Sequence, residues 1–370
     1  GRTFNNPYQY FFEQMHMDDA IYADESIYEY PMQQGGGNDG RPYSFGRPSS
    51  GGSKAAYPCK SYGQGRINPA YFYGVFDPND MRRDVSITMT GSNGKGVEKL
   101  IPFVPTSKAE GGGLTLNKWD ENRQANPWVA AQRKSGINGP YMRMSEVYLG
   151  YAEVCAALGD VVTGKQYLKT VRERSFPQGL ANTDAFIASF GNDLVRAIIE
   201  ERGFEYAGEG DRRWTLIRSG YLPEDIKRIK DMTKAMMDGL ATKGYYEFEN
   251  GNIISAYIWT KLVDAKTIYG HRLTAQCPTD KVNDPVLYPG WRGQKDNWEE
   301  MGLNYGSSTP ATNLAIKGLF EIVSEEEAAS LESQGYTKVN WGIDLVDNRD
   351  EYDKYLFWDY DYVSAPIYLW

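Results

Sequence analysis

The stretch Tyr141-Met-Arg-Met-Ser-Glu-Val-Tyr-Leu-Gly-Tyr-Ala-Glu153 decides the fold class of this 370-residue chain. It continues as an almost unbroken apolar run to Leu158. Asn138-Gly139-Pro140 before it is typical of a helix start, because proline in the first turn lacks only an N–H that the helix leaves unpaired. A helix that is apolar on every side is packed between neighbours. We therefore predict an inner helix from about residue 140 to residue 158.

Two charged side chains interrupt this apolar run. Arg143 and Glu146 lie one turn apart on the predicted helix, and a buried charge is costly unless an opposite charge pairs with it. Acids and arginines that could pair with them follow between residues 200 and 212. The alternative is that Glu201 and Glu205 form an acid–base pair, but neighbouring arginines would hold both carboxylates ionised. The sequence thus predicts a structural ion network of Arg143, Glu146, Glu201, Arg202, Glu205, Glu209 and Arg212.

The residues that follow predict more helices. Gly159-Asp160 ends the first helix, and a second over residues 161–174 would complete a helical hairpin like one unit of a helical-repeat array. Further helices are predicted after Asn192-Asp193, over 212–218 and over 224–243. Asn250-Gly251 predicts a β-hairpin of residues 245–249 and 253–257, and Ser324-Glu-Glu-Glu327 predicts a capped helix ending near Gly335.

The composition divides the chain into three regions. Residues 1–135 are rich in Gly, Asn, Pro and Tyr, with strand-like pieces such as Ser86–Thr90 between glycine clusters. We expect this region to be a loop-rich, aromatic-rich ligand-binding region, because long loops inside compact proteins are usually functional. Residues 136–243 form the predicted helical-repeat region, and residues 244–370 add the hairpin, a loop and a helix.

Composition and charge exclude several classes of protein. With 40 basic and 49 acidic residues the net charge is −9, which offers no basic surface to phosphates, so no nucleic-acid partner is expected. Three separated cysteines and two histidines, without a CxxC pair, indicate neither a zinc site nor a disulfide framework, and no metal or cofactor is expected. No apolar run is long enough to span a bilayer. Both ends read like the middle of a longer protein.

Three blocks of sequence resemble a known family. The stretch quoted above is followed by Val171-Arg172-Glu-Arg174 and then by Glu200-Glu201-Arg202-Gly-Phe-Glu205, which continues through Glu209-Gly210-Asp-Arg212-Arg-Trp214 to Gly220. In order, spacing and residue type these blocks are similar to the signature of the SusD/RagB family of nutrient-binding outer-membrane lipoproteins. Asp80-Met-Arg82 stands in the place of a common DxR element. Thr215, Ser219 and Gly203 depart from the residues usual in the family.

The resemblance implies a fold that is mainly α with long loops and small β elements, in which a helical-repeat hairpin adjoins a loop-rich SusD-like subdomain. It implies a non-catalytic protein that captures an oligosaccharide on the extracellular face of the outer membrane and delivers it to a TonB-dependent, SusC-like transporter barrel. Family members begin with a lipidated cysteine. Membrane contact is therefore expected only through a lipid anchor that is absent from this chain, which would hold the C-terminal part of the family pattern.

The aromatic content indicates where such a ligand would bind. Twenty-eight Tyr and nine Trp supply rings that join an apolar face to a polar tip, which suits ligand stacking. We expect the ligand contacts on loops, where rings lie beside Gly, Asn or Pro, although any single ring could instead pack under its loop. A peptide-binding member of the family and a glycoside hydrolase with paired carboxylates are the alternatives. The expected ligand-binding residues are Tyr62, Tyr71, Tyr73, Trp119, Trp128, Trp291 and Trp298.

Overall fold

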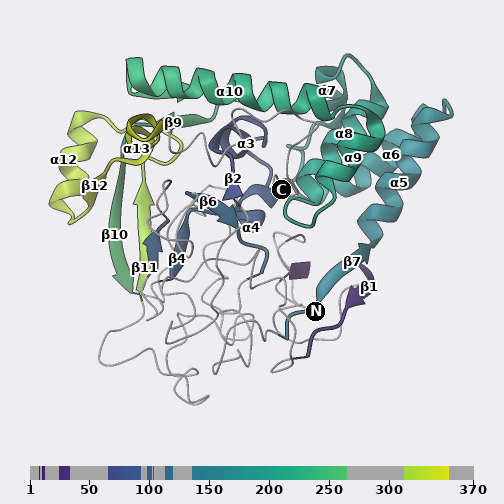
Figure 1. Cartoon of the computed structure of the whole chain (residues 1–370), viewed down its shortest axis with the longest axis horizontal. Helices are drawn as coiled ribbons and strands as arrows, with labels where there is room; N and C mark the ends of the chain where they lie inside the picture. Colours follow the sequence, from purple (N-terminus) through teal and green to yellow (C-terminus); the bar gives the residue numbers. More distant parts are fainter. Residues whose placement is uncertain are drawn as a thin grey trace.

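The computed structural model describes residues 8, 11–12, 25–33, 66–92, 98–101, 103, 113–119, 136–264 and 312–349. Within these ranges the protein is mainly helical, with small two- and three-stranded sheets between and beside the helices (Figure 1). The fold class that the resemblance implies is therefore confirmed. In the same ranges no helix is long and apolar enough to cross a membrane.

A helical hairpin opens the helical side of the molecule. Helix α5 (Met144–Ala157) packs against α6 (Val161–Glu173), and the Asp160 side chain caps α6 by accepting a hydrogen bond from the Thr163 backbone N–H at 3.1 Å. Helices α7 (Thr183–Ser189) and α8 (Leu194–Glu205) follow, and α8 packs against both helices of the hairpin. The predicted hairpin and α8 are confirmed, whereas α7 was not predicted.

Two further helices close this side and link it to the rest of the molecule. Helix α9 (Arg212–Ser219) ends at Gly220 and α10 (Leu222–Lys243) ends at Gly244, both glycines having a φ of 78°, a backbone conformation that favours glycine. Both helices lie within two residues of their predicted bounds. Helix α10 runs along the top of Figure 1, from the α7–α9 group to the opposite side of the molecule.

The structure corrects the predicted start of the first helix. Gly139–Arg143 form strand β7, which pairs antiparallel with β1 (Ser26–Tyr30), so α5 begins only at Met144. The backbone groups of β7 hydrogen-bond to β1, which lies far away in the sequence. The residues around 139–143 alone give no sign of such a partner. The prediction that this helix is buried on all sides is also wrong, because one of its faces is exposed.

The described parts of all three sequence regions share one hydrophobic core. Phe72, Leu116, Met236, Ile254 and Trp341 all belong to it, so packing joins segments that composition separated. The first region contributes several short elements to this part of the molecule. They are β2 (Arg66–Ile67), α3 (Pro69–Gly74), α4 (Arg82–Ser86), β3 (Ile87–Thr88), β4 (Thr90–Ser92), β5 (Glu98–Leu100) and β6 (Leu114–Leu116).

The C-terminal side carries the predicted hairpin and a second sheet. Strands β8 (Tyr245–Glu247) and β9 (Ile253–Ser255) pair around Asn250-Gly251, and the Asn250 side chain donates to the backbone oxygens of Tyr73 and Phe76 at 2.8 and 2.7 Å. Strand β10 (Ile258–Asp264) lies between β11 (Thr312–Lys317) and β12 (Thr337–Val339). Helix α12 (Glu325–Ser333) is capped by Ser324 as predicted, and α13 (Trp341–Asp347) follows β12.

Candidate ligand-binding site

A buried ion network fastens β7 and α4 to α8. The Glu205 carboxylate lies among three guanidinium groups. Arg143 donates to it at 2.7 Å, Arg82 donates at 3.2 Å, and Arg174 donates as well. The side chains of Arg82, Arg143 and Glu205 are at most 2% exposed. These charges therefore join three elements in the interior of the protein.

The other members of this network balance its charge. Glu201 accepts from Arg82 at 2.7 Å and from Arg172 at 2.9 Å, while Glu209 pairs with Arg143 and, at 2.6 Å, with Lys118. Every charge has opposite charges beside it, which offsets the cost of burying it. We call the following residues the ion network: the cations Arg82, Lys118, Arg143, Arg172 and Arg174, and the carboxylates Glu25, Asp80, Glu201, Glu205 and Glu209.

Three residues expected in this network lie elsewhere. Arg212 pairs with Glu200 at 2.8 Å and with Asp225 at 3.1 Å, joining α8, α9 and α10. Arg202 pairs with Asp211. Glu146 lies 3.7 Å from Arg202, but its side chain is 41% exposed. Because Arg143 belongs to a strand and Glu146 to the first turn of α5, the two side chains do not share a helical face.

The electrostatics of these clusters oppose acid catalysis. Burial alone would raise the pKa of Glu205, but Arg174, Arg143 and Arg82 outweigh it and hold that pKa well below its usual range. In the same way, Arg212 and Arg228 outweigh burial and lower the pKa of Glu200 to about 2. A general acid must carry its proton near neutral pH, which neither carboxylate does. Both are suited to holding helices together.

The structure places three of the seven expected ligand-binding rings. Tyr73 and Trp119 have no exposed surface, so neither ring offers a face to a ligand here. Tyr71 is partly buried, and its hydroxyl donates to the backbone oxygen of Gly203 at 3.1 Å. Tyr71 and Tyr73 belong to α3, where Tyr73 is a member of the shared core and Tyr71 packs against it. The remaining four, Tyr62, Trp128, Trp291 and Trp298, lie outside the described residues.

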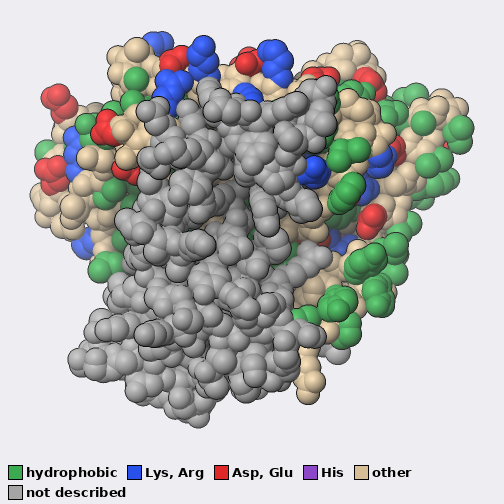
Figure 2. Space-filling view, viewed as in Figure 1, with side chains coloured by type: hydrophobic (Ala, Val, Ile, Leu, Met, Phe, Trp, Pro, Cys, Tyr) green, Lys and Arg blue, Asp and Glu red, His purple; other side chains and the backbone are tan. Residues whose placement is uncertain are grey.

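An exposed aromatic surface lies instead on the two-stranded ribbon of β1 and β7. Tyr28, Tyr30 and Tyr141 are 56%, 58% and 68% exposed. The rings of Tyr28 and Tyr141 meet edge to face, with centroids 5.6 Å apart and planes at 84°. In Figure 2 hydrophobic side chains gather on the edge of the molecule formed by the ribbon and by α5 and α6. We call Tyr28, Tyr30 and Tyr141 the tyrosine surface.

Side-chain hydrogen bonds hold the ribbon to the segments that flank it. Asn138 donates to the Glu29 carboxylate at 2.9 Å and accepts from the backbone N–H of Met32 at the same distance, while Gln33 is exposed at the end of the segment. Sequence reasoning missed this surface, because its rings lie on strands that only their mutual pairing creates. The run Ser26-Ile-Tyr-Glu-Tyr30, rich in strand-forming residues, was the available signal.

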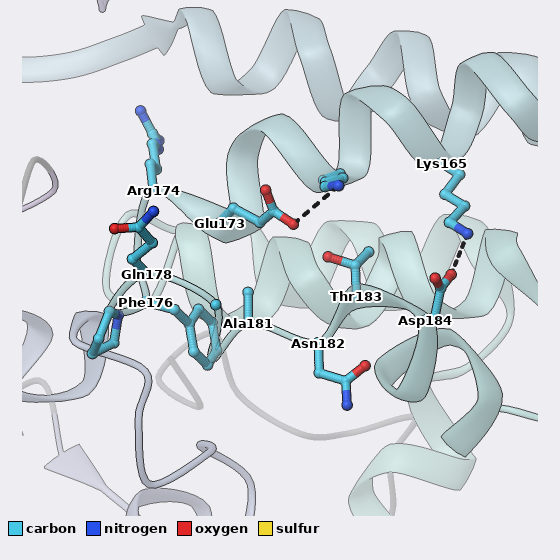
Figure 3. A pocket seen from close by; sticks show the side chains of 12 residues that line it. Lys165, Glu173, Arg174, Phe176, Gln178, Ala181, Asn182, Thr183 and Asp184 are labelled. Atoms are coloured by element: carbon cyan, nitrogen blue, oxygen red, sulfur yellow. Dashed lines mark ion pairs between the residues drawn. The ribbon is translucent and has the colours of Figure 1, made fainter.

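A cavity of about 630 Å³ lies between α6 and the segment leading into α7. Lys165 and Asp184 point toward one another across it and form an ion pair, and Lys169 pairs with Glu173 at 3.5 Å (Figure 3). Phe176 lines the cavity but is only 4% exposed, so no ring face is available there for stacking. Among the residues that the structure describes, no cluster of His, Cys, Asp or Glu side chains could hold a metal ion.

Comparisons with known proteins place these features in a family. The sequence model of the SusD family matches residues 13–289. The SusD-like protein P25 of Formosa agariphila is 28% identical over 160 residues, which are 43% of this chain and 26% of that protein. A solved SusD homologue of Bacteroides thetaiotaomicron is 17% identical with a TM-score of 0.41, over 64% of this chain and 48% of its own.

A second solved protein of Bacteroides thetaiotaomicron is surface glycan-binding protein A in complex with laminarihexaose. It is 17% identical with a TM-score of 0.40, over 60% of this chain and 47% of its own. The chain thus spans less than half the length of each of these relatives.

Proposed function

The chain belongs to the SusD family, and from this premise we propose that it is a non-catalytic protein that binds an oligosaccharide at the bacterial cell surface. The oligosaccharide then passes to a TonB-dependent transporter in the outer membrane. Family membership supports the class of function. The tyrosine surface supports the class of ligand, because a sugar ring presents an apolar face for stacking and hydroxyls for polar groups at the rim.

The tyrosine surface is the observation that carries this proposal. Tyr28 and Tyr141 are held in contact by strand pairing, so their positions are fixed before a ligand arrives. Their hydroxyl groups tolerate water when no ligand is bound. Gln33 is exposed at the end of the β1 segment and can hydrogen-bond to hydroxyls of a sugar.

The ion network and the neighbouring cluster of Glu200 and Arg212 support a protein that does not catalyse a reaction. Neighbouring arginines hold the pKa values of Glu200 and Glu205 below the usual range, so neither carboxylate supplies a proton donor for cleavage of a glycosidic bond. The matching test is incubation of the protein with each oligosaccharide that it binds, followed by chromatography of the sugars. Release of shorter products, abolished by one Asp or Glu substitution, would contradict the proposal.

The binding test compares the parent chain with a Tyr28→Ala/Tyr141→Ala double variant by calorimetry against a panel of neutral and acidic oligosaccharides. We expect at least one oligosaccharide to bind the parent and to lose affinity for the double variant. Trp214→Ala is the matched control, because Trp214 is 67% exposed on α9, which is not part of the ribbon. Equal affinity of the parent and the double variant would show that the tyrosine surface is not the binding site.

Four rings that the sequence predicts on loops complete the test. Tyr62, Trp128, Trp291 and Trp298 stay proposed ligand contacts, and alanine at each is measured against the same oligosaccharide. Binding of oligopeptides in place of sugars would favour the peptide-binding alternative. Co-purification with a TonB-dependent transporter from the native membrane tests delivery, and its failure under conditions that preserve the ligand complex would count against that step.

A further inference from the structure

The cavity between α6 and the segment leading into α7 holds polar atoms that the fold leaves without a partner. Thr183 is 5% exposed, and its hydroxyl has no hydrogen-bond partner among the described residues. In Figure 3 this hydroxyl points toward Glu173, which lies across the cavity at the end of α6. Nε of Arg174, another lining residue, is also buried without a partner in that part of the chain. Because a buried polar atom without a partner destabilises a fold, the two atoms point to a polar ligand that completes their hydrogen bonds.

The charges that line the cavity are balanced. Lys165 pairs with Asp184 and Lys169 pairs with Glu173, and all four side chains are at least 41% exposed. The terminal nitrogens of Arg174 donate to two carboxylates of the ion network. An ion that entered would be attracted by one member of each pair and repelled by the other, whereas a neutral ligand gains hydrogen bonds from both. The lining therefore favours a neutral ligand with several hydroxyl groups.

The size of the cavity and the strength of its ion pairs suit such a ligand. Its volume of about 630 Å³ lies within the range of about 300–1,000 Å³ that is usual for small-molecule sites. Exposed ion pairs are weak, so the ammonium of Lys165 and the carboxylate of Asp184 can turn to hydroxyls of a ligand at little cost. Since Phe176 offers no ring face, hydrogen bonds and not stacking would hold the ligand.

We propose that this cavity is a second sugar-binding site, which takes one neutral sugar unit and holds it by hydrogen bonds from Thr183, Arg174 and the two lysine–carboxylate pairs. It differs from the tyrosine surface, where the rings of Tyr28 and Tyr141 hold a sugar by stacking. The class of ligand rests on the proposed function, whereas the place of the site rests on the cavity alone.

The test measures the affinity of the chain for the methyl glycosides of glucose, galactose and mannose by nuclear magnetic resonance titration. We expect at least one glycoside to bind the parent, and Thr183→Val, which keeps the shape of the side chain, to lower that affinity about fivefold. Asp184→Asn, a change at an exposed side chain, should lower it as well. Thr170→Val is the matched control and should bind as the parent does, since Thr170 is exposed on α6 and does not line the cavity.

The same titrations separate this site from the tyrosine surface. Binding of none of the three glycosides, or equal affinity of the parent and Thr183→Val, would overturn the proposal. Binding lost in Tyr28→Ala/Tyr141→Ala but kept in Thr183→Val would place the sugar unit on the tyrosine surface, which overturns the cavity site and leaves the proposed function intact. Tighter binding of glucuronate than of the glucose glycoside, strengthened further by Asp184→Asn, would make the cavity an anion site and overturn the proposed ligand.

Discussion

Strand β7 presents two different regions of the molecule within three residues. Arg143 at its end is 2% exposed and lies in the ion network, whereas Tyr141, two residues before it, is 68% exposed and belongs to the tyrosine surface. Arg143 meets three carboxylates, those of Glu25, Glu205 and Glu209. The ring of Tyr141 touches the Tyr28 ring and otherwise faces solvent.

This difference separates what holds the fold from what is free to bind. Residues of the ion network have used their hydrogen-bonding capacity on each other, so removing one leaves buried partners uncompensated. Residues of the tyrosine surface leave few protein contacts behind when they are removed. Substitutions in the first region should change stability, and substitutions in the second should change ligand affinity.

The largest expected effect is on the ion network. Arg143→Met should lower the free energy of unfolding by about 3–5 kcal/mol, because the carboxylates of Glu205 and Glu209 would stay buried with fewer opposite charges. Urea unfolding measures this change. Arg218→Met is the control, because Arg218 pairs with Glu153 at the surface, where such a pair contributes about 1 kcal/mol or less. Equal losses from both variants would erase the distinction between the two regions.

Lowering the pH should destabilise the folded protein, because Glu200 gains a proton and loses its ion pairs with Arg212 and Arg228. Its pKa in the folded protein is about 2, below the ordinary value of 4.5, so the folded state binds its proton less readily than the unfolded state. The resulting stability, on the order of 3 kcal/mol, is complete above pH 4.5 and is lost as pH falls from 4.5 toward 2. The free energy of unfolding, measured across this range for the parent and for Glu200→Gln, should fall less steeply in the variant. If the free energy of unfolding fell equally steeply with pH in the parent and in Glu200→Gln, the lowered pKa of Glu200 would be contradicted.

The sequence predicted the ion network better than the tyrosine surface. Four of the seven residues expected in the ion network belong to it, because buried charges leave a signal within an apolar run and in the acids that follow it. They are Arg143, Glu201, Glu205 and Glu209. Arg82 and Lys118 were missed as members, since their partners lie far away in the sequence and only the folded chain brings them together.

Aromatic side chains were less predictable. Tyr73 and Tyr141 both lie beside residues that disfavour helices, yet one has no exposed surface and the other is 68% exposed. Tyr73 lies in the short helix α3, and Tyr141 lies on a strand that exists only through its pairing with β1. Local sequence cannot distinguish these outcomes, because burial of a ring depends on contacts between distant segments.

A smaller effect should separate stacking from hydrogen bonding on the tyrosine surface. Tyr141→Ala should cost about 1–3 kcal/mol of binding free energy for the oligosaccharide, while Tyr141→Phe, which keeps the ring, should cost less than about 1 kcal/mol. Calorimetry gives both values, and thermal unfolding should show melting temperatures close to the parent. A larger loss for Phe than for Ala would show that the ring is not the binding element.

The smallest expected effect compares two helical glycines that differ in their surroundings. A Cβ added to Gly150 of α5 would meet no atom within 4 Å, so Gly150→Ala should stabilise the chain by about 0.5–1 kcal/mol through helix propensity. A Cβ added to Gly203 of α8 would lie 2.7 Å from Arg212 Nη1, so Gly203→Ala must displace the guanidinium that pairs with Glu200 and should destabilise the chain. This close approach also accounts for a glycine in the middle of a buried helix. Urea unfolding of both variants measures the two signs, and a gain in stability from Gly203→Ala would mean that Arg212 does not rest against α8.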